Sequence, residues 1–256
     1  MRAPLLPAFL TTPIAHRGYH DRTQGRMENS AAAFRAAIAA GYGIEMDLQL
    51  SSDGQAMVFH DDDLDRLTSQ TGPLNRQTAK TLTSIQLRGS TDTIPTLPQI
   101  LALVAGRVPL LIEIKDQTGS LSETDGRLEA AAAAALQGYQ GPVAIMSFNP
   151  HSVTHMARFA PDLPRGLTTS GECVDWQPDL AADTCARLLG IPDYEATSSS
   201  FISHSARHLS SPRIADLKSQ GAAILCWTIR SAAAEAEARK IADNITFEGY
   251  AAAKPS

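Results

Sequence analysis

Short apolar runs of strand length alternate along this chain with alanine-rich stretches of helical periodicity. This alternation is typical of β–α units, in which helices join parallel strands. Eight runs are predicted to be strands, at residues 14–17, 43–49, 109–115, 143–148, 165–169, 201–205, 223–229 and 244–247. Seven stretches are predicted to be helices, at residues 30–40, 97–105, 123–137, 150–159, 180–189, 212–220 and 231–241. Several of these open with a capping residue or proline and close with glycine, as helices do.

The order of these elements predicts an α/β fold of the (β/α)₈, or TIM barrel, type. The chain has 256 residues and 43% apolar content, enough to bury one large core. Barrels of this kind commonly have about this length as one domain. We therefore expect a single barrel domain over residues 1–256.

The second predicted strand is followed by the turn sequence Ser51-Ser52-Asp53-Gly54 and by a further extended piece that ends at His60. The interval is too short for a helical crossover. We therefore predict a hairpin-like excursion over residues 48–61 that returns His60 to the barrel mouth. Residues 64–95 are then expected to form a long, polar connection, and loops of that length are usually functional.

Charge and cysteine content narrow the function classes. The net charge is -5, the isoelectric point is near 5.8, and no basic run occurs, which argues against a nucleic acid partner or stable membrane association. The chain has three cysteines, Cys173, Cys185 and Cys226. Their number is odd and they lack a C-x-x-C spacing, so we expect reduced thiols without a disulfide. The apolar stretch 3–10 is too short and proline-broken for a signal peptide, and a cytoplasmic location is expected. These patterns make no prediction of oligomeric state.

Titratable residues gather at the ends of the first predicted strands. His16 follows the first strand, and His60 follows the hairpin piece. Glu45 and Asp47 alternate on the second strand and must therefore point the same way, as must Glu113 and Lys115 on the third. Two imidazoles, three carboxylates, and Arg17 and Lys115 as phosphate-binding cations form a set suited to cleavage of a phosphate ester.

Glu45, Asp47 and Glu113 are predicted to bind one divalent cation. Carboxylates that face into a barrel carry a large desolvation cost unless positive charge neutralises them. Oxygen ligands favour a hard ion, Mg²⁺ or Ca²⁺, and the sequence leaves the two equal. The alternative is a buried salt-bridge network of Glu113, Lys115 and Arg17 without a metal.

The sequence resembles the glycerophosphodiester phosphodiesterase family. The resemblance rests on these motifs, in order: His16-Arg17-Gly18, Glu28-Asn29-Ser30 with Ala33-Phe34, Glu45-Met46-Asp47, Asp53-Gly54, Val58-Phe59-His60-Asp61, Leu64-Asp65-Arg66-Leu67-Thr68, Ile94-Pro95-Thr96-Leu97, Glu113-Ile114-Lys115, Ser147-Phe148 and Trp227-Thr228. It implies a phosphatidylinositol-phospholipase-like barrel without the small domain that some members insert after the His60 region. It also implies that Phe148 and Trp227 form apolar walls of the substrate site.

By this resemblance, we expect metal-dependent hydrolysis of glycerophosphodiesters to sn-glycerol 3-phosphate and an alcohol, a step in glycerol and lipid metabolism. One of His16 and His60 would be the general base on water or on a neighbouring glycerol hydroxyl, and the other the general acid. The alternatives are a lysophospholipase D-type activity on lipids and, from a different class, an inactive phosphodiester-binding barrel. The last is motivated by Arg230 and Glu248, which depart from the family pattern. Arg230 could contact a second group of the substrate or simply face solvent.

Overall fold

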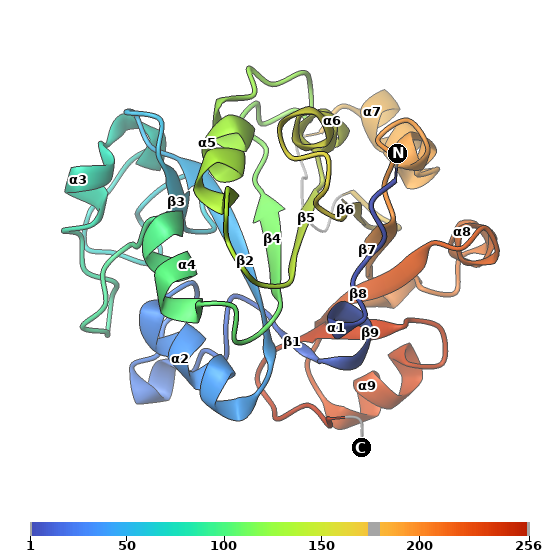
Figure 1. The fold of residues 1–256 in the computed structure, drawn as a ribbon, viewed down its shortest axis with the longest axis horizontal. Helices are drawn as coiled ribbons and strands as arrows, with labels where there is room; N and C mark the ends of the chain where they lie inside the picture. Colours follow the sequence, from blue (N-terminus) through green and yellow to red (C-terminus); the bar gives the residue numbers. More distant parts are fainter. Residues whose placement is uncertain (1, 174–179, 255–256) are drawn as a thin grey trace.

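The computed structural model describes residues 2–173 and 180–254, and it contains a closed barrel of eight parallel strands with helices between them (Figure 1). The strands are β1 (Ile14–Ala15), β2 (Gly43–Leu50), β4 (Leu110–Ile114), β5 (Val143–Ser147), β6 (Arg165–Thr169), β7 (Phe201–Ser205), β8 (Ala223–Ile229) and β9 (Asn244–Phe247). They neighbour one another in the order β1, β9, β8, β7, β6, β5, β4, β2, and the pairing of β1 with β2 closes the barrel. This confirms the predicted fold class.

The main helices are α2 (Ala31–Ala40), α4 (Leu97–Val104), α5 (Arg127–Leu136), α6 (Pro150–Phe159), α7 (Ala182–Leu189), α8 (Pro212–Ser219) and α9 (Ala232–Ala238). Their starts are fixed locally: the Ser30 side chain accepts a hydrogen bond from the Ala33 amide, and Thr96 and Gln99 form a capping box. The predicted helix 123–137 begins only at Arg127, because Gly126 before it takes a left-handed conformation with φ of 75°. Shorter helices are α1 (Ala8–Thr11), α3 (Ala79–Leu82) and the 3₁₀ turns Arg22–Gln24, Leu74–Arg76, Pro192–Tyr194 and Ala206–His208.

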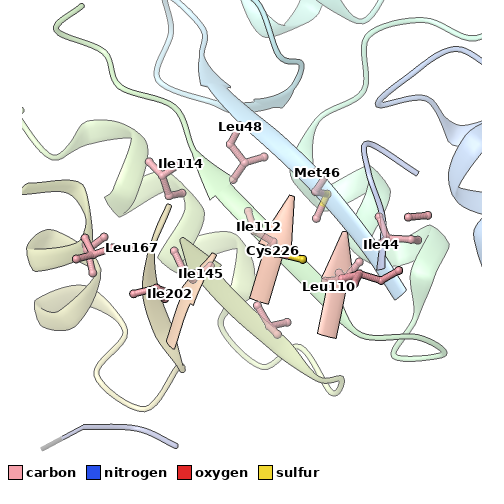
Figure 2. Close-up of a cluster of buried hydrophobic side chains, with 14 of the residues drawn as sticks. Ile44, Met46, Leu48, Leu110, Ile112, Ile114, Ile145, Leu167, Ile202 and Cys226 are labelled. Atoms are coloured by element: carbon pink, nitrogen blue, oxygen red, sulfur yellow. The ribbon is translucent and has the colours of Figure 1, made fainter. Parts of the chain in front are cut away.

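Strand β2 shows how the barrel separates two environments. All eight of its residues are buried, yet they alternate between faces. Ile44, Met46 and Leu48 point into the apolar layer between the strands and the helices, together with side chains of the neighbouring strands (Figure 2). Glu45 and Asp47 consequently point into the barrel. Burial of the outward-facing apolar side chains stabilises the strand, and this offsets the cost of burying two carboxylates on its inner face.

The end of the barrel at which the strands begin is closed by apolar side chains and by α1. Phe9 of α1 packs with Ile14, Leu111 and Phe201 in a buried cluster. The Asn244 amide donates hydrogen bonds to the backbone oxygens of Phe9 (2.8 Å) and Thr12 (2.6 Å), which holds α1 in place. The sequence patterns did not predict this helix, because four residues are too few for a periodic signal. The opposite end of the barrel is thereby left as the open mouth.

The hairpin prediction is confirmed, because β3 (Ala56–Val58) pairs antiparallel with β2, Leu48 lying opposite Val58. The expectation of a merely polar connection over residues 64–95 is wrong. Apolar side chains of this segment form a small core of their own, to which Met27, Met57 and Phe59 from outside the segment also belong. The members from within the segment are Leu64, Leu67, Leu74, Ala79, Leu82, Ile85, Leu87 and Ile94. These apolar residues are too widely spaced to give a helix or strand pattern, and only tertiary contact brings them together. The cluster supports the segment that carries His60 and Arg66.

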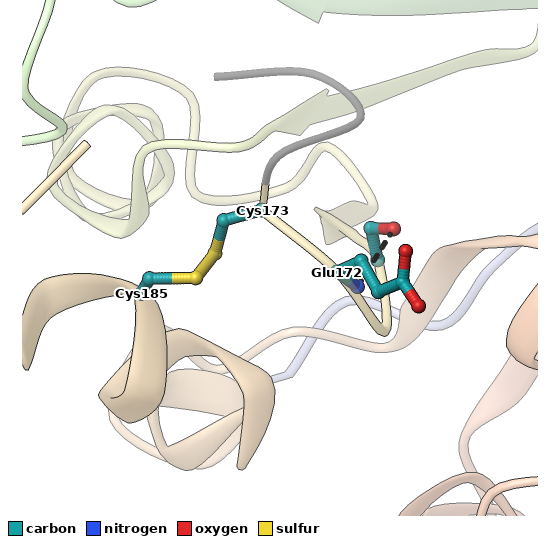
Figure 3. The surroundings of a disulfide bond; sticks show 4 residues. Glu172, Cys173 and Cys185 are labelled. Atoms are coloured by element: carbon teal, nitrogen blue, oxygen red, sulfur yellow. Dashed lines mark hydrogen bonds between the residues drawn. A yellow bond between two sulfur atoms is a disulfide. The ribbon is translucent and has the colours of Figure 1, made fainter. Parts of the chain in front are cut away.

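The expectation of three reduced cysteines is also wrong. Cys173, just after β6, is joined to Cys185 of α7 by a disulfide, as Figure 3 shows. The sequence separation of 12 gave no sign of this, because pairing depends on how the chain returns after β6. Cys226 on β8 is buried as a free thiol. No helix among the described residues is long and apolar enough to cross a membrane.

Candidate active site

Three buried carboxylates meet inside the barrel mouth. Glu45 and Asp47 come from β2, and Glu113 comes from β4, where it lies opposite Asp47 in the strand register. Each residue offers a ligand oxygen, and these oxygens lie within 4.8 Å of one another. Such a spacing suits shared ligation of one hard cation. The alternation and register of parallel strands are therefore sufficient to build the cluster.

The charges around this cluster are unevenly compensated. The Lys115 ammonium lies 2.8 Å from Glu113 Oε1 and 3.6 Å from Asp47 Oδ1, and these carboxylates outweigh the effect of burial and raise the pKa of Lys115. Burial, together with the negative charges of Asp47 and Glu113, instead raises the pKa of Glu45 well above its ordinary value. The cluster thus carries more negative charge than its nearby cations neutralise. The donor set and its charge both fit a divalent ion better than the metal-free salt-bridge alternative.

Arg17 is placed in the site by a tight turn after β1. Arg17 has a φ of 53° and Gly18 a φ of 82°, and a side chain at Gly18 would collide with Phe34 of α2. A non-glycine residue with positive φ is strained, and such strain is common at functional sites. The turn lets the Arg17 amide donate to Glu45 Oε2 (2.9 Å), while the guanidinium lies 3.4 Å from Asp47 Oδ2. Arg17 therefore contacts the carboxylate cluster through both its backbone and its side chain.

Both histidines are oriented by a carboxylate. The Nδ1 atom of His16 lies 2.5 Å from Glu248 Oε2, and the Nδ1 atom of His60 lies 2.7 Å from Asp61 Oδ1. A carboxylate accepts a hydrogen bond from the Nδ1–H group, which leaves Nε2 of each ring available for proton transfer. The Nε2 atom of His16 is 3.9 Å from Glu45 Oε2, so it faces the carboxylate cluster. Burial lowers the pKa of His16, and the Glu248 carboxylate opposes that shift.

A chain of ion pairs links Arg17 to His60 and was not interpreted at the sequence level. Glu28 accepts hydrogen bonds from Arg17 Nη1 (2.6 Å) and from two nitrogens of Arg66 (2.7 and 2.8 Å). Arg66 in turn donates to both oxygens of Asp61, the partner of His60. Burial opposes the charge on Glu28, but the two guanidinium groups lower its pKa to about 2. Glu28 and Arg66 stood within family motifs, and only the fold shows that they meet.

Asn29, next to Glu28, contacts the carboxylate cluster directly. Its side-chain amide donates to Asp47 Oδ2 at 2.8 Å, and Asn29 takes a left-handed conformation with φ of 55°. Ser30, the following residue, is the N-cap of α2. The same short segment therefore begins a helix and orients one of the three clustered carboxylates.

Both residues that depart from the family pattern, Arg230 and Glu248, form ion pairs at the edge of the mouth. Glu248 follows β9 and holds His16, as described above. Arg230 follows β8, its side chain is 64% exposed, and its Nε atom lies 2.8 Å from Glu248 Oε1. Arg230 thus pairs with Glu248 at the edge of the mouth, where it lines the cavity while most of its side chain faces solvent.

A cavity of about 680 Å³ is lined by the three clustered carboxylates, both histidines, Arg17, Lys115, Asp61 and Arg66. One side, formed by β1, β2 and β4, is charged, with His16, Arg17, Glu45, Asp47, Glu113 and Lys115. The other side is neutral, with Met146, Phe148, Thr168 and Trp227. The rings of Phe148 and Trp227 meet edge to face with centroids 5.6 Å apart. The structure thus brings every residue selected from the sequence into one cavity, on two chemically different walls.

The fold and the cavity define a (β/α)₈ barrel protein in which two carboxylate-oriented histidines flank an acidic cluster suited to a divalent cation. Residues 16–245 match the Glycerophosphoryl diester phosphodiesterase family, and the chain belongs to this family.

Two relatives named glycerophosphodiester phosphodiesterase are about 30% identical to this chain over the matched regions. The chain is 30% identical over 164 residues to a glycerophosphodiester phosphodiesterase of Caldanaerobacter subterraneus, in a match that covers 61% of this chain and 66% of that protein. It is 29% identical over 184 residues to the enzyme of that name from Bacillus altitudinis, covering 68% of this chain and 72% of that protein. Each matched region therefore spans about two-thirds of the relative's length.

A solved structure extends the likeness over nearly the whole chain. A phosphodiesterase of Oleispira antarctica, in complex with the product sn-glycerol-3-phosphate, superposes with a TM-score of 0.76. The match covers 94% of both chains at 22% sequence identity. At this level of identity the likeness shows a shared fold.

Proposed function

We propose that this protein hydrolyses glycerophosphodiesters to sn-glycerol 3-phosphate and an alcohol. The observation that carries the proposal is the pair of carboxylate-oriented histidines beside the Glu45, Asp47 and Glu113 cluster in one cavity. Family membership supports the same reaction class. The product found with the Oleispira antarctica protein supports a small glycerophosphate ligand.

Glu45, Asp47 and Glu113 would hold one divalent cation, Mg²⁺ or Ca²⁺. When bound, such an ion supplies positive charge next to the phosphate and stabilises the charge that develops on it. Arg17 and Lys115 lie against the same carboxylates and would bind the other phosphate oxygens. The guanidinium and the ammonium are already positioned by Asp47 and Glu113, so little reorganisation is required when substrate binds.

His16 and His60 would divide the proton transfers. One Nε2 accepts the proton of the attacking hydroxyl, and the other donates a proton to the leaving alcohol. Glu248 and Asp61, hydrogen-bonded to the Nδ1 atoms, keep each ring in one orientation. The attacking hydroxyl is that of water or of the neighbouring glycerol carbon.

Phe148 and Trp227 would form the wall beside the organic part of the substrate. A lysophospholipase D-type activity is the alternative within the enzyme class, and it would require a lipid chain to leave the cavity past this wall. The alternative of an inactive binding barrel was based on Arg230 and Glu248, which depart from the family pattern. It is weakened because Glu248 orients His16 and Arg230 pairs with Glu248. We therefore favour hydrolysis of small glycerophosphodiesters over hydrolysis of lipid substrates and over binding without turnover.

The predicted single domain over residues 1–256 and the cytoplasmic location stay predictions. The Cys173–Cys185 disulfide argues against the second, because disulfides persist mainly in oxidising compartments.

The proposed function is tested by turnover of the choline, ethanolamine, glycerol and inositol glycerophosphodiesters with Mg²⁺, Ca²⁺ or Mn²⁺. We expect release of sn-glycerol 3-phosphate that chelation abolishes and that Asp47→Asn reduces strongly. His151→Ala is the matched control, because His151 is exposed on α6 away from the cavity. Absence of turnover of every diester with every ion would refute the proposal, and turnover of lysophospholipids alone would favour the lipid alternative.

A further inference from the structure

Arg66 lines the cavity and is hydrogen-bonded to two carboxylates at once. Its Nε and Nη2 atoms donate to the two oxygens of Asp61 at 2.6 and 2.8 Å. Its Nη1 and Nη2 atoms donate to the two oxygens of Glu28 at 2.8 and 2.7 Å. A guanidinium group has five N–H donors, and these two carboxylates engage four of them. Arg66 therefore has little capacity left to bind a substrate directly.

The two carboxylates that Arg66 binds serve different groups of the site. Asp61 Oδ1 lies 2.7 Å from Nδ1 of His60, which follows β3. Glu28 Oε1 accepts a hydrogen bond of 2.6 Å from Nη1 of Arg17, which follows β1. His60 is a proposed proton-transfer group and Arg17 a proposed phosphate-binding group. One guanidinium therefore connects the supports of both.

The backbone on either side of Arg66 is fixed by the small apolar core outside the barrel. Leu64 and Leu67 belong to this core, and each is 1% exposed. The Arg88 amide donates to the Leu67 oxygen at 2.7 Å, and the Arg88 side chain donates to the Asp65 oxygen at 3.2 Å. The side chain of Arg66 is 41% exposed, but the chain that carries it is anchored on both sides. The core thus presents Arg66 to the site from a rigid support.

We propose that Arg66 is a positioning residue that holds His60 and Arg17 in one fixed geometry about the phosphate. This role rests on the proposed function. A displacement of about 1 Å in a reacting group can slow a reaction about 10²-fold, so the supports of such groups matter. The planar fork of arginine bonds two carboxylates at once, and the ammonium of lysine does not reproduce this geometry. Arg66→Lys therefore retains the charge and removes the connection.

Two measurements on single variants test this role. They are kcat for the preferred glycerophosphodiester, and the affinity of the metal-loaded protein for sn-glycerol 3-phosphate by titration calorimetry. Asp61→Asn should lower kcat about tenfold, the value of one charge-assisted hydrogen bond, and change the affinity less than about twofold. Glu28→Gln should weaken the affinity about tenfold through Arg17. Arg66→Lys should produce both losses, and Arg66→Gln is a second variant for which the same result is expected.

The Arg66→Lys/Asp61→Asn double variant separates positioning from a general structural role. If Arg66 acts on His60 through Asp61, the double variant should have a kcat within about twofold of Asp61→Asn alone. Its affinity for sn-glycerol 3-phosphate should equal that of Arg66→Lys alone. A general structural defect would instead add its full loss of kcat to that of Asp61→Asn, because independent effects are additive. Thermal melting verifies that each variant is folded at the assay temperature.

Arg22→Gln is the matched control. Arg22 also pairs with Glu28, but at 3.4 Å and with a side chain that is 62% exposed, so its removal should change kcat and affinity less than about twofold. The inference is overturned if Arg66→Lys retains kcat and affinity, if its kcat loss adds in full to that of Asp61→Asn, or if Arg22→Gln causes the same losses. Each of these outcomes leaves the proposed function intact. Absent diester turnover by the unaltered protein would instead refute the proposed function, and this inference with it.

Discussion

The two walls of the cavity differ in how their side chains are held. On the side of β1, β2 and β4, nearly every functional group is charged and bound to another charge, from Lys115 on Glu113 to Arg17 on Glu28. On the side of β5 to β8, the lining is aromatic, aliphatic or hydroxyl-bearing, and Phe148 packs on Trp227. One wall is organised by ion pairs and the other by packing.

This difference shows how a barrel can bury strong charges and still bind an organic group. Buried charges require partners, so concentrating them on neighbouring strands lets each neutralise the next. The neutral wall opposite offers aromatic, aliphatic and hydroxyl-bearing surface to the organic part of a ligand. We therefore expect chemistry to depend on the charged wall and ligand selection on the neutral one.

The largest effect should follow from removing a histidine of the charged wall. His60→Ala and His16→Ala are each expected to lower kcat by about 10²–10⁴, the usual value of a general acid or base. Steady-state turnover of the preferred glycerophosphodiester measures this, with thermal melting to verify folding. Near-normal kcat in either variant would remove that histidine from the proposed proton transfers.

The ion pairs of the charged wall should also make it sensitive to acid. Glu28 has its pKa lowered from 4.5 to about 2 by Arg66 and Arg17 against the effect of burial, so it contributes about 3 kcal/mol to stability at neutral pH. Because the folded-state pKa is the lower one, this contribution is complete above pH 4.5 and is lost as the pH falls toward 2.

Glu28→Gln should accordingly lower the free energy of unfolding at pH 7, and the difference from the unaltered protein should shrink toward pH 2. Denaturant unfolding across this range measures it. Glu129→Gln is the control, since Glu129 is a buried glutamate of α5 that accepts its hydrogen bond from Thr124. A pH-independent difference for Glu28→Gln would argue against the ion-pair origin of its stabilisation.

On the neutral side, chemical reduction of the disulfide should lower the stability of the protein more than its turnover. The Cys173–Cys185 disulfide ties the end of β6 to α7, and a loop of this length contributes about 3 kcal/mol when closed. Reductant should lower the melting temperature while kcat stays within about twofold. The Cys173→Ser/Cys185→Ser double variant should melt lower from the start and show no further response to reductant. A melting temperature of the unaltered protein that reductant leaves unchanged would contradict the pairing.

The smallest effect is expected at the boundary of the two walls. Glu248→Gln should lower kcat about tenfold, since one charge-assisted hydrogen bond to His16 is weakened and the ring is less firmly oriented. The Glu248 carboxylate raises the pKa of His16 against the effect of burial, so its removal should shift the limb of the pH–rate profile that follows His16 to lower pH. Glu237→Gln on the exposed face of α9 is the control. An unshifted profile would assign Glu248 to structure alone.

Much of the architecture was predictable because its signals are local. The strands at 43–49, 165–169, 201–205, 223–229 and 244–247 were predicted within a residue of their observed bounds, and Ser30 and Thr96 mark helix starts by their own side chains. Apolar periodicity and capping need only neighbouring residues, so a sequence shows them directly. The alternation of Glu45 and Asp47 is local in the same sense, and strand register places Glu113 beside them.

Only the tertiary structure decided which distant residues meet. The apolar cluster within 64–95, the Cys173–Cys185 bond, the Glu28–Arg66–Asp61 chain and the Glu248–His16 pair all join segments that sequence spacing leaves unrelated. The sequence by itself determined the elements and the chemical groups at their ends. The closing of the barrel decided the partners, because burial and charge compensation depend on all strands at once.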